Sequence, residues 1–222
     1  SSEMRREQLK KLQRKLSDQP YLLGREDHIN TGVLVLLALI NDEYHFVLEE
    51  RQLEIRQGGE ICFPGGVFEP EQDTDTRHTA IRETVEELGI PKEQLELIGA
   101  LGTLYTSVGA IVDAYVGVCH LQNLNELQIN HSEVRSVFTI PVSDFKNTEP
   151  EEYRAIVQVH PSCTDESTGE ERILFPSKKL GLPDRYSQPW GSRSHRILVY
   201  KMGSKTVWGI TARLIYELIR IM

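Results

Sequence analysis

The stretch Arg82-Glu83-Thr84-Val85-Glu86-Glu87-Leu88-Gly89-Ile90 concentrates glutamates in a segment with helical periodicity. At about 100° per residue these glutamates fall on one helix face, and the aliphatic residues Ile81, Val85 and Leu88 fall on the opposite face. Glu83 and Glu87 are neighbours one turn apart, where two like charges destabilise a helix by roughly 0.2–0.5 kcal/mol. Such a face is either a solvated acidic surface or a row of oxygen ligands for a divalent cation.

The residues around this stretch favour a ligand-binding role. Asp75–Leu88 is predicted to be one helix, which Gly89 and Pro91 end. Gly65-Gly66 precede it at loop distance, and glycines there let the backbone come close to a metal ion or a phosphate. A tight turn would also use these glycines, so they are compatible with both interpretations.

The rest of the chain predicts an α+β fold with a mixed sheet. Gly32–Ile40 is a short, continuous apolar run typical of a buried strand, and Tyr44–Leu48 is its antiparallel return. Ile210–Ile221 has the spacing of an amphipathic helix. Short strands are further predicted near Leu95–Leu101, Val112–His120, Val137–Val142, Tyr153–Val159 and Arg196–Met202.

Composition excludes some classes of function. The 222 residues hold 25 Lys and Arg against 33 Asp and Glu, a net charge of −8, which argues against a nucleic-acid-binding protein. The longest apolar run, Gly32–Ile40, is far shorter than the ~20 residues of a membrane helix, so no membrane partner is expected. Cys62, Cys119 and Cys163 form no metal-binding or disulfide spacing, which favours a reducing, cytoplasmic location.

Two parts of the chain depart from the predicted domain. Residues 1–28 form a lead-in with a basic amphipathic helix, which we expect to dock on the domain through Leu9, Leu12 and Leu16. A transit peptide or a membrane-surface helix is the alternative, and Glu7 argues against an acid-poor transit signal. Residues 29–222 form the main domain, and 161–194 is a polar excursion rich in Pro and Gly, interpreted as a long surface loop or lid.

Gly66 followed by residues 82–90 resembles the Nudix box, written GX5EX7REUXEEXGU, where U is aliphatic. The second half departs only at Thr84. In the first half, Gln72 stands where the pattern has Glu, and the spacing from Gly66 to Arg82 is two residues longer than in the pattern. Candidates for the missing carboxylate are Glu69, Glu71 and Asp73.

A second resemblance lies upstream. Arg51, Arg56, Gly59 and Phe63-Pro64-Gly65-Gly66 are similar to the signature that precedes the Nudix box in coenzyme A pyrophosphatases, although the step from Arg56 to Gly59 is one residue shorter. Tyr105-Thr106-Ser107 with Gly109 and Val112 is similar to that family's middle segment, and residues 207–212 are similar to its C-terminal helix. With these segments the resemblance covers roughly residues 30–222, and it implies an α/β/α sandwich with a mixed sheet.

The resemblance also implies roles for individual residues. Mg²⁺ or Mn²⁺ would be held by Glu83, Glu87, Glu86 and the Gly66 carbonyl. The catalytic residues would be Glu83, Arg82 and Glu86, with Glu83 or the loop acid Glu133 as general base. The substrate would be bound by Arg51, Arg56 and Gly65.

The implied activity is metal-dependent hydrolysis of a pyrophosphate bond, in coenzyme A or its derivatives, giving 4′-phosphopantetheine and 3′,5′-ADP. One alternative is a Nudix hydrolase of another nucleoside diphosphate such as ADP-ribose. The other is a non-catalytic nucleotide-binding module, which the presence of all three helix glutamates disfavours. The expected partner is a small-molecule nucleotide, and the sequence leaves a homodimer open.

Overall fold

The computed structural model describes residues 4–121 and 123–222. The helices are α1 (Arg6–Lys15), α2 (Thr76–Leu88), α3 (Val142–Lys146) and α4 (Gly209–Arg220). The strands are β1 (Ile29–Ile40), β2 (Glu43–Arg51), β3 (Ile61–Cys62), β4 (Gly65–Val67), β5 (Leu95–Tyr105), β6 (Ala110–Cys119), β7 (Val134–Pro141), β8 (Glu151–Val159), β9 (Ser162–Thr164), β10 (Glu171–Ile173), β11 (Trp190–Met202) and β12 (Lys205–Trp208). Short 3-10 helices lie at Arg25–Asp27, Lys92–Gln94, Leu124–Glu126 and Asp184–Ser187.

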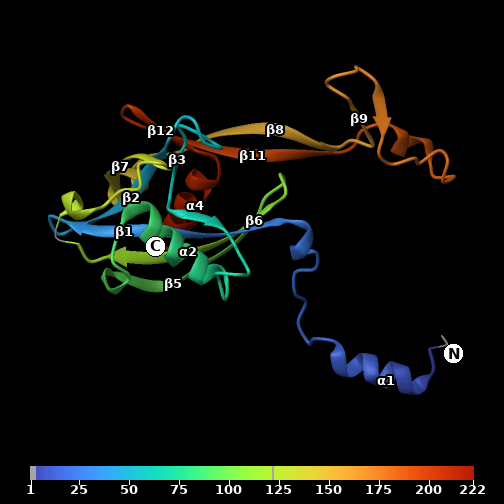
Figure 1. Cartoon of the computed structure of the whole chain (residues 1–222), viewed down its shortest axis with the longest axis horizontal. Coiled ribbons are helices and arrows are strands. Elements are labelled where there is room, and N and C mark those ends of the chain that lie inside the picture. Colours follow the sequence, from blue (N-terminus) through green and yellow to red (C-terminus); the bar gives the residue numbers. More distant parts are fainter. Residues whose placement is uncertain (1–3, 122) are drawn as a thin grey trace.

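Strand β1 is the centre of a seven-stranded mixed sheet (Figure 1). One of its edges pairs in parallel with β6 along almost its whole length. The other edge is shared: β4 pairs with Thr31–Val33 and β2 pairs with Leu37–Ile40, both antiparallel. Strands β2 and β4 therefore diverge from a common neighbour, and the sheet is split at this edge.

Helices cover both faces of the sheet, as the alternation along β1 requires. Leu34 and Leu36 face α2 and pack in one buried cluster with Ala80 and Leu88. Val35 faces the opposite side and belongs to a second cluster with residues of α3 and α4. The predicted α/β/α sandwich with a mixed sheet is confirmed.

Helix α2 begins and ends where local chemistry predicts. The Asp75 side chain accepts a hydrogen bond from the His78 N–H at 2.8 Å, and Gly89 takes a left-handed conformation with φ of 64°. The helix lies directly on β1: a Cβ atom at Gly32 would come within 2.1 Å of the Thr76 carbonyl oxygen. Gly32 thus sets how closely α2 approaches the sheet.

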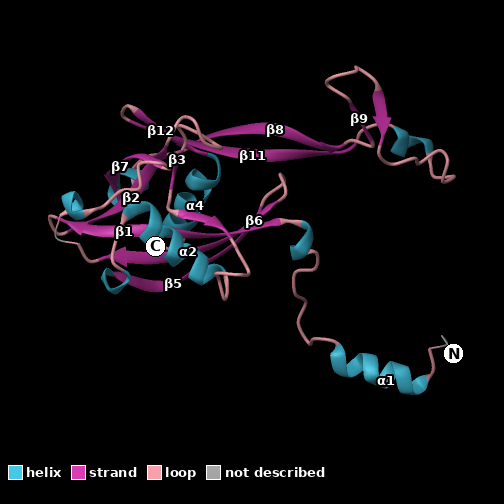
Figure 2. Cartoon of the chain, in the orientation of Figure 1, coloured by secondary structure: helices cyan, strands magenta, loops and turns pink. Residues whose placement is uncertain are grey.

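The N-terminal helix forms, but its predicted docking is wrong. Leu9, Leu12 and Leu16 are 55%, 41% and 65% exposed, and α1 has no buried residue. Figure 2 shows α1 projecting away from the sheet at the end of an extended lead-in. The division into a lead-in and a main domain stays a prediction.

The 161–194 excursion has more structure than a loop. Strands β8 and β11 form a long antiparallel ribbon that projects from the sheet, and the short pair β9–β10 lies at its far end (Figure 1). Phe175 and Tyr186 each make a ring contact with Trp190 there, with centroids 6.0 Å and 5.3 Å from that of Trp190.

Replacing Gly32 by Ala should destabilise the fold, because the new methyl group meets the backbone of α2. Overpacking of this kind costs about 1–3 kcal/mol. The free energy of unfolding in urea should fall by that amount. Gly99→Ala is the matched control, since a Cβ atom there meets nothing within 4 Å. Equal stability of the two variants would contradict this account of Gly32.

Candidate active site

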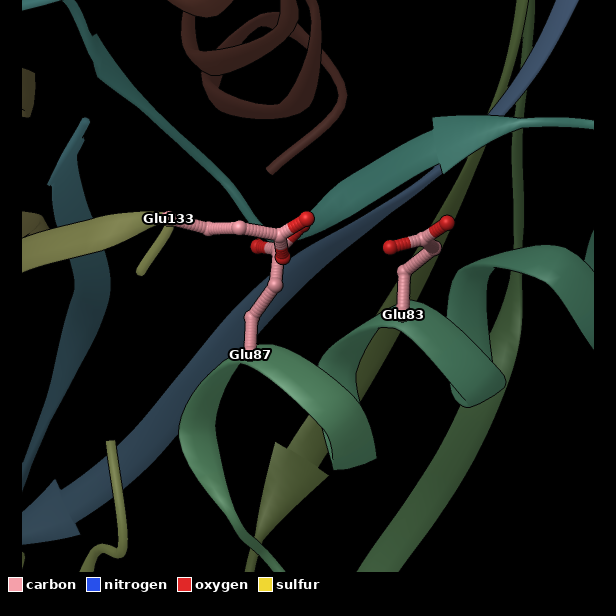
Figure 3. Close-up of side chains that lie close together, drawn as sticks. All are labelled: Glu83, Glu87 and Glu133. Atoms are coloured by element: carbon pink, nitrogen blue, oxygen red, sulfur yellow. The ribbon is translucent and has the colours of Figure 1, made fainter. Parts of the chain in front are cut away.

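Three carboxylates meet at the split edge of the sheet. Glu83 and Glu87 extend from α2, and Glu133 comes from the loop before β7 (Figure 3). One oxygen from each lies within 4.8 Å of the others, and we call this set the carboxylate cluster. Sequence analysis named all three residues.

Backbone contacts fix the loop that supplies Glu133. The Asn130 N–H donates to the Glu87 carbonyl oxygen at 2.9 Å, which ties the loop to the end of α2. The Gln52 N–H donates to the Glu133 carbonyl oxygen at 2.9 Å, which ties the same loop to the residue after β2. The position of Glu133 therefore depends on two separate elements.

Glycine at position 66 makes room for Glu83. A Cβ atom there would lie 2.4 Å from Oε1 of Glu83, so the β4 backbone passes directly over this carboxylate. Glycine is needed at position 65 for close packing against β1, because a Cβ atom there would lie 2.6 Å from the Gly32 carbonyl oxygen. The structure thus brings Gly66 to the cluster and places Gly65 against β1.

Arg82 is held by Asp73. Its Nε and Nη2 donate to the two carboxylate oxygens of Asp73 at 2.7 Å and 2.9 Å, and Asp73 is only 5% exposed. Asp73 also accepts hydrogen bonds from Thr79 Oγ1 and from the Glu69 N–H. Of the three acids proposed for the missing Nudix-box carboxylate, Asp73 is therefore the one that meets Arg82.

The other end of Arg82 points to the helix glutamates. Nη1 donates to Glu83 at 3.1 Å and to Glu86 at 3.3 Å. The Glu86 side chain is 51% exposed and lies outside the carboxylate cluster. The buried face of α2 therefore includes Glu87 with Ala80 and Leu88, and the expected grouping of all three glutamates on one face, opposite the aliphatic residues, is wrong.

A fourth acid, Glu49 on β2, lies beside the cluster and was missed by sequence analysis. It is 1% exposed and accepts a hydrogen bond from the Cys62 thiol, with Sγ 3.6 Å from Oε1. The sequence contains a pattern that could have identified it: Val47, Glu49 and Arg51 are two residues apart and so lie on one face of a strand. That face could be identified as buried only once α2 was placed over it.

The two predicted substrate arginines differ in position. Arg51 lies close enough to Glu49 and Glu87 for its charge to lower the pKa of both carboxyl groups. Arg56 is exposed, and the contact described for it is made by its carbonyl oxygen, which accepts from Arg51 Nε at 3.3 Å. The structure brings Arg51 to the cluster and leaves Arg56 at its rim.

Burial dominates the electrostatics of the site. It raises the pKa of Glu83, Glu87 and Glu49, because desolvation disfavours the charged form. Oε2 of Glu49 and Oε2 of Glu87 are buried, and neither has a hydrogen-bond partner within the described residues. Buried charge without a partner is strongly unfavourable, so these oxygens suit a bound cation. An all-carboxylate donor set fits Mg²⁺ or Mn²⁺.

A family model described as the NUDIX domain matches residues 30–159. The chain belongs to the Nudix hydrolase family. The predicted family is thereby confirmed, and it agrees with the position of the box residues around the cluster.

Several curated relatives are similar to this chain. It is 36% identical to the peroxisomal coenzyme A diphosphatase ndx-8 of Caenorhabditis elegans, over 59% of this chain and 55% of the relative. It is 36% identical to the mouse peroxisomal coenzyme A diphosphatase NUDT7, over 60% of this chain and 57% of the relative. The chain thus spans little more than half the length of these relatives. A Nudix hydrolase from Photorhabdus laumondii, NudL, is 28% identical over 85% of this chain and 83% of its own length.

Among solved structures, a C. elegans Ap4A hydrolase binary complex aligns with a TM-score of 0.44 at 23% identity. The alignment covers 54% of this chain and 84% of that chain. The family assignment rests on the domain match.

Asp73→Asn should lower stability at neutral pH by about 3 kcal/mol, because it leaves the Arg82 charge buried without its partner. Arg82 holds the pKa of Asp73 below its usual range, so the stabilisation is complete above the unfolded pKa of about 3.9 and is lost as the pH falls through the lower folded value. The unfolding free energy of the variant should therefore depend less on pH in this acid range. Glu71→Gln, an exposed acid nearby, is the control, and identical pH profiles for Asp73→Asn and the parent would contradict this role.

Proposed function

We propose that the chain is a Mg²⁺- or Mn²⁺-dependent hydrolase of the pyrophosphate bond of coenzyme A or its derivatives, giving 4′-phosphopantetheine and 3′,5′-ADP. The observation that carries this is the carboxylate cluster with Arg51 beside it. Carboxylates supply ligands for a cation, and an arginine supplies charged donors to a phosphate. The similarity to two proteins named coenzyme A diphosphatases supports the choice of substrate.

The cation would be held by Glu83 and Glu87, with the Gly66 carbonyl close by and Glu86 contributing only if its side chain turns inward. When bound, such a cation neutralises phosphate charge and acidifies a water molecule. Arg82 is a positioning residue: anchored by Asp73, it orients Glu83. Arg51 would bind the diphosphate at the side of the cluster facing β2.

Two acids can accept the proton of the attacking water, Glu83 and Glu133. Glu83 is fixed by Arg82 and by the β4 backbone, which suits a ligand with constant geometry. Glu133 is on a loop and is half-buried, which suits a group that exchanges protons with solvent. Glu133 is therefore our choice for the base.

Two other functions stay open to test. A Nudix hydrolase of ADP-ribose would use the same cluster, so only substrate comparison separates it. A non-catalytic nucleotide sensor is disfavoured because Glu83, Glu86 and Glu87 are all present. Within the described residues, no helix is long and apolar enough to cross a membrane. The cytoplasmic location and the homodimer stay predictions.

Glu83→Gln and Glu87→Gln should each lower kcat by about 10²-fold or more, because metal stabilisation of phosphate charge is worth several kcal/mol. The measurement is the rate at which 4′-phosphopantetheine and 3′,5′-ADP are formed from coenzyme A at saturating Mg²⁺. Glu93→Gln, an exposed acid just beyond α2, should retain the parent rate. Both cluster variants turning over normally would refute the assignment.

The arginines should separate two parts of the substrate. Arg51→Ala should lower kcat/KM for coenzyme A and for dephospho-coenzyme A alike, by about 10–100-fold, the equivalent of one charge-assisted hydrogen bond. Arg56→Ala, at the rim, should lower it only for coenzyme A, which carries the 3′-phosphate. Parent enzyme that cleaves ADP-ribose faster than either compound would contradict the coenzyme A proposal and leave the Nudix assignment intact.

A further inference from the structure

The N-terminal segment has apolar side chains that no described part of the domain covers. Between residues 4 and 23 every large apolar side chain is exposed: the three leucines of the α1 stripe, Met4 before the helix, and residues 21–23 after it. Leu23 reaches 77% exposure and Tyr21 reaches 72%. Figure 2 shows the helix lying apart from the sheet. Since a concentration of exposed apolar residues usually marks an interaction surface, this segment calls for a partner.

The leucines form one narrow stripe along α1. Leu9, Leu12 and Leu16 are three and four residues apart, so at about 100° per residue they lie within a sector of about 60°. All other residues of the helix are polar or charged. A helix with one apolar stripe and a polar remainder is typical of a helix that lies at a boundary between water and an apolar phase.

The polar face of α1 is strongly basic. Its ten residues include five Lys or Arg against one Glu, a net charge of +4. Within the described residues none of these five basic side chains makes a salt bridge. The whole chain, in contrast, has 25 Lys and Arg against 33 Asp and Glu. The helix is therefore a local basic surface on an acidic protein, and an anionic surface is its electrostatic complement.

Two anionic surfaces can cover α1: a bilayer with acidic lipids, or the acidic domain of a second copy. The sides of the stripe favour the bilayer. Arg6 lies about 60° beyond Leu9, and Lys15 lies about 60° beyond Leu12 on the other side. A protein groove needs acids placed along both walls to match them, whereas lipid headgroups surround an embedded helix on both sides. Long basic side chains at the border of a stripe reach those headgroups readily.

We propose that α1 binds the surface of a bilayer containing anionic lipids, with its leucine stripe among the acyl chains and its basic side chains at the headgroups. Residues 21–23 would add a second apolar contact, and the acidic domain would stay in the water. The sequence left a membrane-surface helix as the alternative to docking on the domain, and the exposed leucines favour that alternative. The expectation of no membrane partner rested on the lack of a spanning segment, which a surface helix does not need. The inference goes beyond the proposed hydrolysis and does not depend on it.

Co-sedimentation of the full chain with lipid vesicles tests this. Vesicles of phosphatidylcholine with phosphatidylserine should bind it at least about tenfold more tightly than vesicles of phosphatidylcholine alone, and added salt should weaken the binding. The double variant Leu9→Gln, Leu12→Gln should bind at least about tenfold more weakly, because its apolar burial is lost. Lys10→Gln should lower the affinity about fivefold through the loss of one charge. Leu180→Gln, which changes a leucine that is 59% exposed in the 161–194 excursion, is the matched control and should bind like the parent.

Equal binding of the parent to both kinds of vesicle, or no binding to either, would overturn the proposal. Equal binding of the parent and the double leucine variant would also overturn it. If light scattering instead shows that this variant converts a dimer into a monomer, and the parent does not bind vesicles, a second copy covers the stripe. The variants should keep the parent's unfolding free energy and its hydrolysis of coenzyme A, because the changed side chains are exposed and α1 lies apart from the carboxylate cluster. Failure of this proposal therefore leaves the proposed function intact.

Discussion

The close contact between helix α2 and the split edge of the sheet is the constraint on which the site depends. Gly32 lets the first turn of the helix rest on β1, and Gly66 lets β4 pass over Glu83. Strands β2 and β4 share one edge of β1, and β4 passes beside the helix at Glu83. Acidic side chains that would otherwise lie in water are thereby turned inward, and their charge becomes available to a cation.

The position of Arg82 follows from the same contact. Asp73 lies in the loop that leads into α2 and binds the guanidinium with both oxygens, while Thr79 on the first turns of the helix binds Asp73. The loop, the helix and the Glu83 carboxylate are therefore linked in one hydrogen-bonded chain. Loss of the positive charge would leave Asp73 buried without its partner and would release Glu83, so folding and chemistry are coupled here.

The sequence predicts the fold well where local chemistry decides it. Asp75 and Gly89 mark the ends of α2, and the apolar run of β1 identifies the central strand. Strands β3 and β4 have only two and three residues, too few for any periodicity, so they were not predicted. The prediction that α1 docks on the domain was wrong, because an apolar stripe indicates that a helix can pack but does not specify what it packs against.

The site shows a similar division. Glu83 and Glu87 differ by about 40° around the helix axis, while Glu86 lies about 60° on the other side of Glu83, and the sheet accepts only the first pair. That choice depends on how α2 is rotated against β1, which helical periodicity does not define. Asp73 and Glu49 needed tertiary information as well: the first depends on the fold of a loop, and the second on which face of β2 is covered.

The most direct test of the central claim is anomalous diffraction from crystals of the protein grown with Mn²⁺. The account predicts an anomalous peak coordinated by carboxylate oxygens of Glu83 and Glu87, with Glu133 and the Gly66 carbonyl oxygen adjacent. A peak bound instead to the solvent-facing Glu86, or no peak at a Mn²⁺ concentration that supports hydrolysis of coenzyme A, would contradict it.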